Sequence, residues 1–593
     1  MASPLGGEKR RVRDGVEIEE TWPPMRSLRF TLCVMALVAG MGMPVLSPAD
    51  PGRIRDLSPT SLQRRLTAVV DHAARCTVRI DTDDGMGSGT ILSSDGLILT
   101  SAHVIEGADD VVVTLTDGRR FPGRILGING QGDIALVSIS AKGLPHATLD
   151  ERDAVAPGQW VVAVGHPVSA FDDFQPTVSA GVVQRVDGVI RAGEDKVFRH
   201  AIVSDVPLSP GSSGGGLWDL QGHLAGLNAA VTRNERGAFS VRIAEYLADA
   251  GRLRRGERFD RKAASSDEDA EGVGRSTDRR SYFRNNLGYL ESRLAARTVT
   301  LRDDTSTLGR GFIVSGKGEV LTPSGLAEGE LPGFRVAARL SDGRVVAARL
   351  VAVDRTNDVA LWALPEDDDC GDYPFFRLDA AVTPARGALA LQGAGGRSGM
   401  KGGIVGAPQR TPPLVMTGEV YYPNVVQVDL RLYRQDLGSP VMDIDGRLIG
   451  MVVQHRLRRS ENAWSREPFG AFLLPPSVLM ESYRLLRQGH GRGERPVGFL
   501  GVGLEDLTVF EKQRLGVQQG VAVALADRRF PAYRAGIRSR DVILEIDGKS
   551  VGSRGQAIQV ITGLHRGEHV PIVVKRRGRR VTFDVEIADR KDI

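Results

Sequence analysis

Cysteine is scarce in this chain of 593 residues. Only three are present, Cys33, Cys76 and Cys370, and they lie far apart in the sequence. Disulfide-stabilised small domains and structural zinc sites need several cysteines at close and regular spacing. The sequence therefore offers neither framework, and we expect no metal and no other cofactor.

An excess of charge of one sign is also missing. Lysine and arginine number 77 and aspartate and glutamate 73, which leaves a net charge of +4. A dedicated nucleic-acid-binding protein carries a larger basic excess for its size, so we expect no nucleic-acid partner. One local basic run, "VKRRGRR" near the C-terminus, is interpreted as a solvated strand and turn.

Long hydrophobic runs are missing except near the N-terminus. There an apolar run at about 30–43 follows Arg26 and Arg29, with small residues shortly after it. The run is shorter than the roughly 20 residues of a membrane-spanning helix. We therefore expect residues 1–49 to be a signal peptide, with an uncleaved membrane anchor as the alternative. The leader is unusually long, which makes Met25 a candidate start, and the protein is expected to be exported to the periplasm or cell envelope.

The chain does contain a succession of short β-rich segments. Between Val78 and Ala248, runs such as "GTILSSDGLILTSAHVI" and "DIALVSIS" are separated by Asp-Gly and Asn-Gly turns. Many short strands at close spacing favour a β-barrel or sandwich over alternating β-α units. The next segment, 255–283, is charged and poor in large apolar residues, so it is predicted to be a disordered linker.

The same pattern returns after this segment. "GRGFIVSGKGEVLTPSGLAEG" at 309–329 parallels "GSGTILSSDGLILTSAHVIEG" at 87–107, and "GSPVMDIDGRLIGMV" parallels "GGGLWDLQGHLAGLN". A whole domain is thus duplicated. From about residue 496 the character changes again, and "YRAGIRSRDVILEIDGKSV" suggests a compact third domain of strands with one or two helices.

The glycine-rich stretch "SPGSSGGGLW" at 209–218 raises the question of a serine nucleophile. Such a nucleophile needs a base, a carboxylate that orients the base, and backbone N–H groups for the oxyanion. The first β-rich segment supplies His103, Asp133 and Ser213, in that order. The nucleophile elbow of α/β-hydrolases needs the order Ser, acid, His and a helix after the serine. Here "LWDLQGHLAGLN" reads as strand, turn, strand, so the elbow is rejected.

These segments resemble the trypsin-like serine proteases of the HtrA (Deg) family over about residues 78–248. The family loop G-N-S-G-G aligns with residues 211–215, which makes Ser213 the nucleophile and Ser212 its variable neighbour. The same match makes His103 the general base and Asp133 its orienting carboxylate. It also implies an oxyanion hole formed by the N–H groups of Gly211 and Ser213, aided by Ser212.

Two further positions bear on substrate and structure. His166 stands where the family commonly has asparagine, and we interpret it as structural. Pro207 aligns with the base of the primary specificity pocket. No carboxylate is present there, so a preference for a small or medium aliphatic side chain is expected rather than one for lysine or arginine.

The second copy has lost two of the three residues. Gly325 stands in place of the histidine and Leu437 in place of the serine, which leaves Asp358 with nothing to orient. Ser439 in "QDLGSP" carries little weight without a histidine. A leucine cannot attack a carbonyl, so this copy is predicted to be a pseudo-protease that serves packing, assembly or substrate binding.

The C-terminal segment resembles a PDZ domain. "GFLGV" matches the carboxylate-binding loop, and "AGIRSRDVILEIDGKSV" matches the middle strands. A peptide C-terminus would be held by backbone amides of this loop while the peptide adds a strand to the sheet edge. Tyr533 stands where a small residue is common, so the peptide preference stays open. The peptide-binding residues are expected to be Phe499, Leu500, Gly501 and Val502.

Together these resemblances imply a mainly β protein with two trypsin-like double β-barrel domains and a PDZ domain. The expected boundaries are 50–254 for the active domain, 284–489 for the degenerate one and 490–593 for the PDZ domain. The implied function is an endopeptidase that hydrolyses unfolded or damaged proteins through an acyl-enzyme, binds C-terminal peptides and forms homo-oligomers. The alternatives are a non-catalytic peptide-binding scaffold and, with less support, an esterase-like hydrolase.

Overall fold

The computed structural model describes most of the chain from residue 57 onward. The predicted leader lies outside the described residues. Within the described part, no helix is long and apolar enough to cross a membrane. The described residues are 57–83, 85–166, 174–192, 196–208, 211–231, 238–260, 279–303, 306–366, 372–393, 400–410, 422, 424–430, 432, 434–453, 459–460, 463–464, 471–493, 498–507 and 509–589.

The first β-rich segment forms two barrels. In the first, the strand order is β14-β5-β4-β1-β2-β3-β6, and a further pairing of β5 with β6 closes the sheet. Alternate residues of these short antiparallel strands point inward and form an aliphatic core. The strands are β1 (Thr77–Thr82), β2 (Met86–Ile91), β3 (Leu97–Thr100), β4 (Val111–Thr114), β5 (Arg120–Asn129), β6 (Ile134–Ser138) and β14 (Arg258–Phe259), and the short helix α2 (Ala102–Ile105) follows β3.

The second barrel has the order β11-β8-β9-β10-β13-β12-β7 and is closed by the pairing of β11 with β12. The glycine-rich stretch lies directly before β11, at the side of the barrel that faces β2 of its neighbour. The strands are β7 (Thr148–Leu149), β8 (Trp160–Gly165), β9 (Thr177–Ala192), β10 (Lys196–Ser204), β11 (Gly216–Asp219), β12 (His223–Val231) and β13 (Ala238–Arg242), followed by α3 (Ile243–Arg254).

The duplication predicted from the sequence appears as a second pair of closed barrels, ordered β15-β16-β17-β20-β19-β18 and β21-β22-β23-β28-β25-β24. Asp133 and Asp358 occupy equivalent turns with nearly the same unusual φ, 52° and 56°. The elements are β15 (Thr298–Arg302), β16 (Thr307–Ile313), β17 (Glu319–Thr322), η1 (Ser324–Ala327), β18 (Arg335–Arg339), β19 (Val345–Asp354), β20 (Val359–Ala363), β21 (Leu389–Gly393), β22 (Met400–Arg410), β23 (Val425–Val428), η2 (Arg434–Asp436), β24 (Pro440–Met442), β25 (Leu448–Val452), β26 (Arg459–Ser460), β27 (Ala463–Trp464), β28 (Ala471–Leu474) and α7 (Pro476–Leu486).

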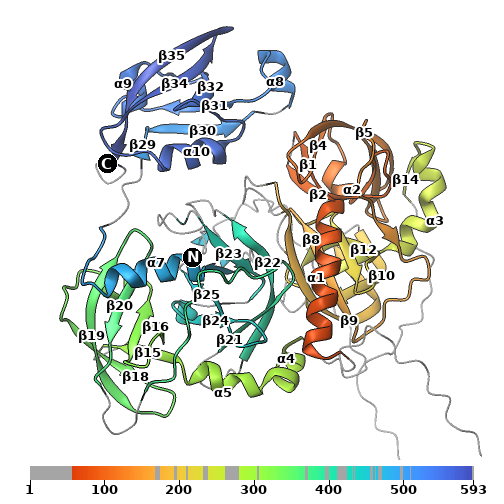
Figure 1. The fold of residues 1–593 in the computed structure, drawn as a ribbon. Helices are drawn as coiled ribbons and strands as arrows, with labels where there is room; N and C mark the ends of the chain where they lie inside the picture. Colours follow the sequence, from red (N-terminus) through yellow and green to blue (C-terminus); the bar gives the residue numbers. More distant parts are fainter. Residues whose placement is uncertain are drawn as a thin grey trace, which may run out of the picture.

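Three helices join the two barrel pairs, which Figure 1 shows side by side. They are α1 (Pro59–Cys76), α4 (Arg279–Leu287) and α5 (Tyr289–Ala295). Helix α1 begins at Ser58, whose side chain caps it, with proline in the first turn. Its apolar face belongs to a hydrophobic cluster that contains residues of both pairs. The two pairs therefore share one core.

The predicted linker is ordered at both of its ends. Arg258 and Phe259 form β14, which adds to the first barrel in parallel with the end of β5. The Arg252 guanidinium lies 3.4 Å from the centre of the Phe259 ring, which anchors this strand. The prediction of disorder is therefore wrong at 255–260 and at 279–283, where α4 begins, because these positions pack on the barrels. Residues 261–278 lie outside the described part.

The C-terminal segment forms a separate small domain with a hydrophobic cluster of its own. Its main sheet runs β30-β31-β32-β34-β35, with β33 paired to β32, and β30 is an edge strand. The basic "VKRRGRR" run is the β34–β35 hairpin, where Arg576 pairs with Asp541 and Arg580 with Glu545. The elements are β29 (Gly498–Phe499), β30 (Val502–Asp506), α8 (Val509–Leu515), β31 (Val521–Ala526), α9 (Pro531–Ala535), β32 (Val542–Ile546), β33 (Lys549–Ser550), α10 (Arg554–Thr562), β34 (His569–Arg576), β35 (Arg579–Glu586) and β36 (Ala588–Asp589).

Candidate active site

His103 and Asp133 form a direct hydrogen-bonded pair. His103 lies on α2, immediately after β3, and Asp133 lies in the turn between β5 and β6. The imidazole Nδ1 lies 2.9 Å from both carboxylate oxygens, and the backbone N–H of His103 donates to Oδ1 at 3.0 Å. The aspartate side chain is 1% exposed and that of the histidine 40%. A buried carboxylate thus fixes the ring of a histidine that is open to solvent.

The carboxylate also determines which ring nitrogen of His103 can accept a proton. Because a carboxylate only accepts hydrogen bonds, Nδ1 must carry a proton, and Nε2 is then the basic nitrogen of the neutral ring. Asp133 reaches this position with φ of 52°, in the left-handed region that aspartate tolerates better than most residues. The pair has the orientation that a general base requires.

The glycine-rich loop is pinned to the first barrel. The backbone N–H of Ser88 donates to the carbonyl of Ser213 at 2.8 Å, and the Ser88 hydroxyl donates to the carbonyl of Gly211 at 2.7 Å. Gly214 has φ of 80°, and a Cβ there would lie 2.3 Å from the Thr100 hydroxyl, at the end of the strand that leads to His103. Only glycine fits this approach. The loop that carries Ser213 and the strand that leads to His103 are therefore fixed against each other.

Ser213 and its neighbours differ in what their polar groups contact. The Ser213 hydroxyl donates to the carbonyl of Ala229 at 2.9 Å. No described residue accepts a hydrogen bond from the N–H of Gly211 or of Ser213. Ser212 is buried, and its carbonyl accepts from the N–H of Gly215 at 3.0 Å. Two backbone donors of this loop, those of Gly211 and of Ser213 itself, thus have no acceptor among the described residues.

His166 has the structural environment expected for it. Its backbone N–H donates to the Ser88 hydroxyl at 2.7 Å, so it supports the same serine that holds Gly211. The imidazole is buried, and burial lowers its pKa to about 3. The ring is therefore neutral at physiological pH. The role of Ser88 is not predicted from the sequence. Nothing in the sequence marks a serine within a strand as the partner of a loop more than 100 residues away.

The equivalent site of the second copy is filled. Asp358 accepts hydrogen bonds from the N–H and hydroxyl of Ser324 at 2.9 and 2.7 Å and from the Tyr422 hydroxyl at 2.5 Å. Burial raises the pKa of this carboxyl, and burial followed by the neighbouring carboxylate raises that of the Tyr422 hydroxyl. The expectation that Asp358 has nothing to orient needs correction, because it holds these two residues in place of a histidine.

In the second copy, a buried cluster of charged side chains lies beside the loop that is equivalent to the Ser213 loop. Arg310 occupies the place of Ser88, and its N–H donates to the carbonyl of Leu437 at 3.1 Å. Its guanidinium lies 3.3 Å from Asp436, which also binds Lys401 at 2.5 Å. Arg310 also donates to the hydroxyl of the fully buried Ser439, which argues against this serine as a nucleophile. A charged residue within the apolar "GRGFIV" run is the signal that could have revealed a buried partner.

The predicted peptide-binding loop of the C-terminal domain precedes the edge strand β30. Gly501 has φ of 74°, and a Cβ there would lie 2.0 Å from that of Phe530. The ring of Phe530 packs edge-on against Phe499, with centroids 5.1 Å apart. Leu500 is buried and its carbonyl accepts from Ala532, but no described residue accepts from the N–H of Leu500 or Gly501. Val502 begins β30, whose outer edge is unpaired within the sheet.

The described residues offer neither a metal-binding cluster nor a reactive thiol. No group of three or more His, Cys, Asp or Glu side chains there could hold a metal ion. Cys76 is buried, its sulfur lies 3.7 Å from Nε2 of His72, and burial raises its thiol pKa to about 12. This thiol is therefore protonated and unreactive at neutral pH.

Comparisons with known proteins agree with this architecture. The trypsin-like peptidase domain matches residues 87–227 and 309–451, and the PDZ domain matches residues 498–587. The serine protease HhoB of Synechocystis sp. is 35% identical over 173 residues, which are 28% of this chain and 40% of the relative. A DegP-like periplasmic serine endoprotease of Halomonas elongata is 34% identical over 173 residues, 28% of this chain and 35% of the relative.

The chain thus spans less than half the length of these curated relatives. A solved structure of a serine endoprotease from Yersinia pestis aligns with 88% of this chain and 97% of its own, at 14% identity and a TM-score of 0.28. The two trypsin-like matches, the PDZ match and the DegP-like relatives agree with the resemblance found in the sequence. The chain belongs to the HtrA (Deg) family of trypsin-like proteases that carry a PDZ domain.

Proposed function

We propose that the protein is a serine endopeptidase whose active site is His103, Asp133 and Ser213. The observation that carries the proposal is the pairing of His103 with a buried Asp133 beside a loop pinned to the same barrel. The Ser213 hydroxyl turns from Ala229 toward Nε2 of His103, loses its proton to that nitrogen, and attacks the peptide carbonyl. The imidazolium then protonates the leaving amine, and water hydrolyses the acyl-enzyme by the same steps in reverse.

The negative charge of the tetrahedral intermediate falls on the former carbonyl oxygen. The N–H groups of Gly211 and Ser213, with the buried Ser212 between them, form the oxyanion hole in this proposal. Loss of a single such donor typically raises the barrier by about 3–4 kcal/mol, a factor of roughly 10²–10³ in kcat. Ser88 supports this arrangement, because its hydroxyl donates to the carbonyl of Gly211 and so fixes the residue that supplies one of the donors.

Substrates and location follow from the family. We propose that unfolded or damaged proteins are hydrolysed, and that the PDZ domain binds C-terminal peptides at residues 499–502, beside the unpaired edge of β30. Export to the periplasm is proposed because the Halomonas elongata relative is named periplasmic. We also propose that the protein forms homo-oligomers. The pocket at Pro207 is proposed to prefer a small or medium aliphatic side chain of the substrate. The proposed domain boundaries are 50–254, 284–489 and 490–593.

Degradation of casein by purified residues 50–593 tests this function. We expect Ser213→Ala to abolish degradation and Ser212→Ala to retain it, because only the first removes the nucleophile. Leu437→Ser, the matched control in the second copy, should leave the rate of the parent unchanged. Absence of degradation by the parent, even with C-terminal peptides added, would contradict an endopeptidase and favour a non-catalytic peptide-binding scaffold.

A further inference from the structure

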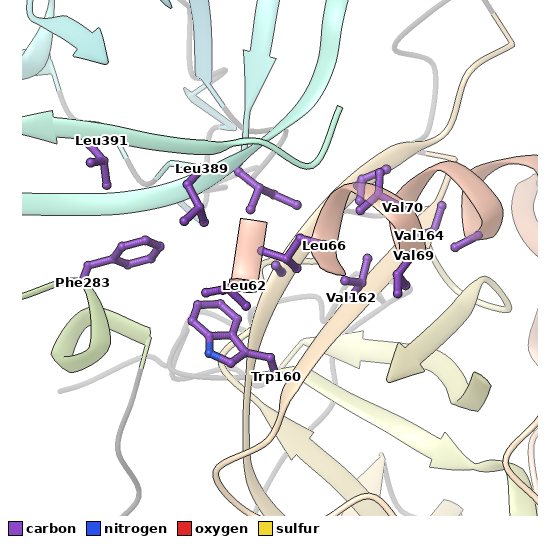
Figure 2. Packing of buried hydrophobic residues seen from close by; sticks show 14 of the residues in the cluster. Leu62, Leu66, Val69, Val70, Trp160, Val162, Val164, Phe283, Leu389 and Leu391 are labelled. Atoms are coloured by element: carbon purple, nitrogen blue, oxygen red, sulfur yellow. The ribbon is translucent and has the colours of Figure 1, made fainter. Parts of the chain in front are cut away.

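The second barrel pair packs directly on the first. Figure 2 shows Leu62 and Leu66 of α1 beside Trp160 of the first pair and Leu389 of the second. A Cβ on Gly387 would lie 2.9 Å from the Cα of Thr67. Such close backbone approach and a continuous apolar core indicate a fixed contact between the pairs rather than a flexible tether.

A buried ion pair lies at the polar part of this contact. The Arg279 guanidinium donates to Asp429 of the second pair at 2.7 Å and to the carbonyl of Ala180, in β9 of the first pair, at 2.6 Å. The N–H of Ala180 in turn donates to Asp429 at 3.0 Å. The side chains of Arg279 and Asp429 are 11% and 2% exposed. One residue of β9 is thus bound through both its N–H and its carbonyl.

The same arginine also reaches the segment that leads to the nucleophile. Its backbone N–H donates to Asp205 at 2.9 Å, and the other oxygen of Asp205 accepts from Val182 of β9 at 2.6 Å. A Cβ on Gly181 would lie 2.6 Å from the backbone nitrogen of Val206, so this segment lies directly on β9. From here the chain continues through the buried residues 206–208 toward the loop that carries Ser213.

From these contacts we infer that the second barrel pair acts as an internal clamp for the active site. It fixes β9 through Asp429, and Arg279 transmits this position to Asp205 and hence to the loop at 211–213. Arg279 is a positioning residue in this scheme. The role requires neither a histidine nor a serine in the second copy, which explains how that site could be filled by other side chains while the domain was retained. The part of this inference that concerns catalysis rests on the proposed function.

Two conservative variants of residues 50–593 test the clamp. Asp429→Asn removes the charge and Arg279→Lys removes the planar fork that contacts Asp429 and Ala180 together. Asp342→Asn, at an exposed ion pair with Arg344 in the second pair, is the matched control. The readouts are hydrogen exchange of backbone amides at 205–213 and kcat and KM for a short chromogenic peptide.

We expect both variants to exchange faster at 205–213, and kcat to fall about tenfold or more because a displaced loop misplaces Ser213. The control should match the parent in both readouts. Unchanged exchange at 205–213 in Asp429→Asn would overturn the clamp, and so would an increase spread evenly over both barrel pairs, which indicates general destabilisation. A parent protein that hydrolyses no peptide would contradict the proposed function but not the clamp. The clamp is tested by hydrogen exchange, which does not require an active enzyme.

Discussion

Ser88 and His166 determine the shape of the nucleophile loop although neither takes part in the proposed chemistry. The N–H of His166 donates to Ser88, and Ser88 donates to Gly211. The histidine ring is fully enclosed, and its Nε2 has no partner among the described residues. Burial opposes protonation of the ring, and the positive charges of Arg79 and Arg410 add to this effect, so the pKa falls to about 3.

This lowered pKa predicts a loss of stability in acid. Between pH 6.5 and 3 the unfolded chain binds a proton at His166 and the folded chain does not. The unfolding free energy should therefore fall as the pH falls, by at most about 1.4 kcal/mol per pH unit from this group. His166→Asn should make the unfolding free energy depend less steeply on pH, as measured by urea unfolding from pH 7 to 4.

His565→Asn, at an exposed position of the C-terminal domain, is the control and should keep the slope of the parent. An equal slope for His166→Asn and the parent would contradict the assignment of a neutral buried ring.

At the scale of single residues, sequence and structure agree where a motif is local. His103, Asp133 and Ser213 were predicted from short segments, and the pairing of the first two is present in the structure. Ser88 and the Arg310–Asp436–Lys401 cluster were not predicted, because their partners lie far along the chain and no spacing rule connects them.

At the scale of elements, the strands follow from the sequence and the joining helices do not. Short β-rich runs and Asp-Gly turns predicted a barrel or a sandwich, and the family resemblance implied barrels. The repeated segments predicted the second pair, which the structure confirms. Helix α1 was not predicted. Its apolar stripe would equally suit packing on its own domain, so the sequence does not reveal that it contacts both barrel pairs.

Helix α1 is expected to contribute strongly to stability. Leu66 is fully buried between the pairs, so Leu66→Ala leaves a cavity and should lower the unfolding free energy by about 2–5 kcal/mol. Leu331→Ala, at a side chain that is 77% exposed, should change it by less than about 0.5 kcal/mol. Denaturant unfolding of both variants measures this. Similar midpoints for Leu66→Ala and the parent would contradict a shared core.

At the scale of the whole molecule, one of two homologous sites keeps the histidine, aspartate and serine of the proposed triad, and the other is filled. The filled site is stabilised by Asp358 with Tyr422 and by the Arg310–Asp436 pair, so it can serve as a rigid body. The intact site lies in the barrel pair that this body contacts through Arg279 and Asp429. If the first copy catalyses and the second copy positions it, the second copy can lose its catalytic residues but must keep its fold.

The measurement that tests the central claim most directly is covalent labelling with a fluorophosphonate, followed by mass spectrometry of the digested protein. Such a reagent reacts with a serine only when a base and an oxyanion hole activate it. The account predicts one labelled serine, Ser213, and loss of the label in His103→Ala. Absence of label in the folded parent, or label at Ser212 or Ser439, would contradict it.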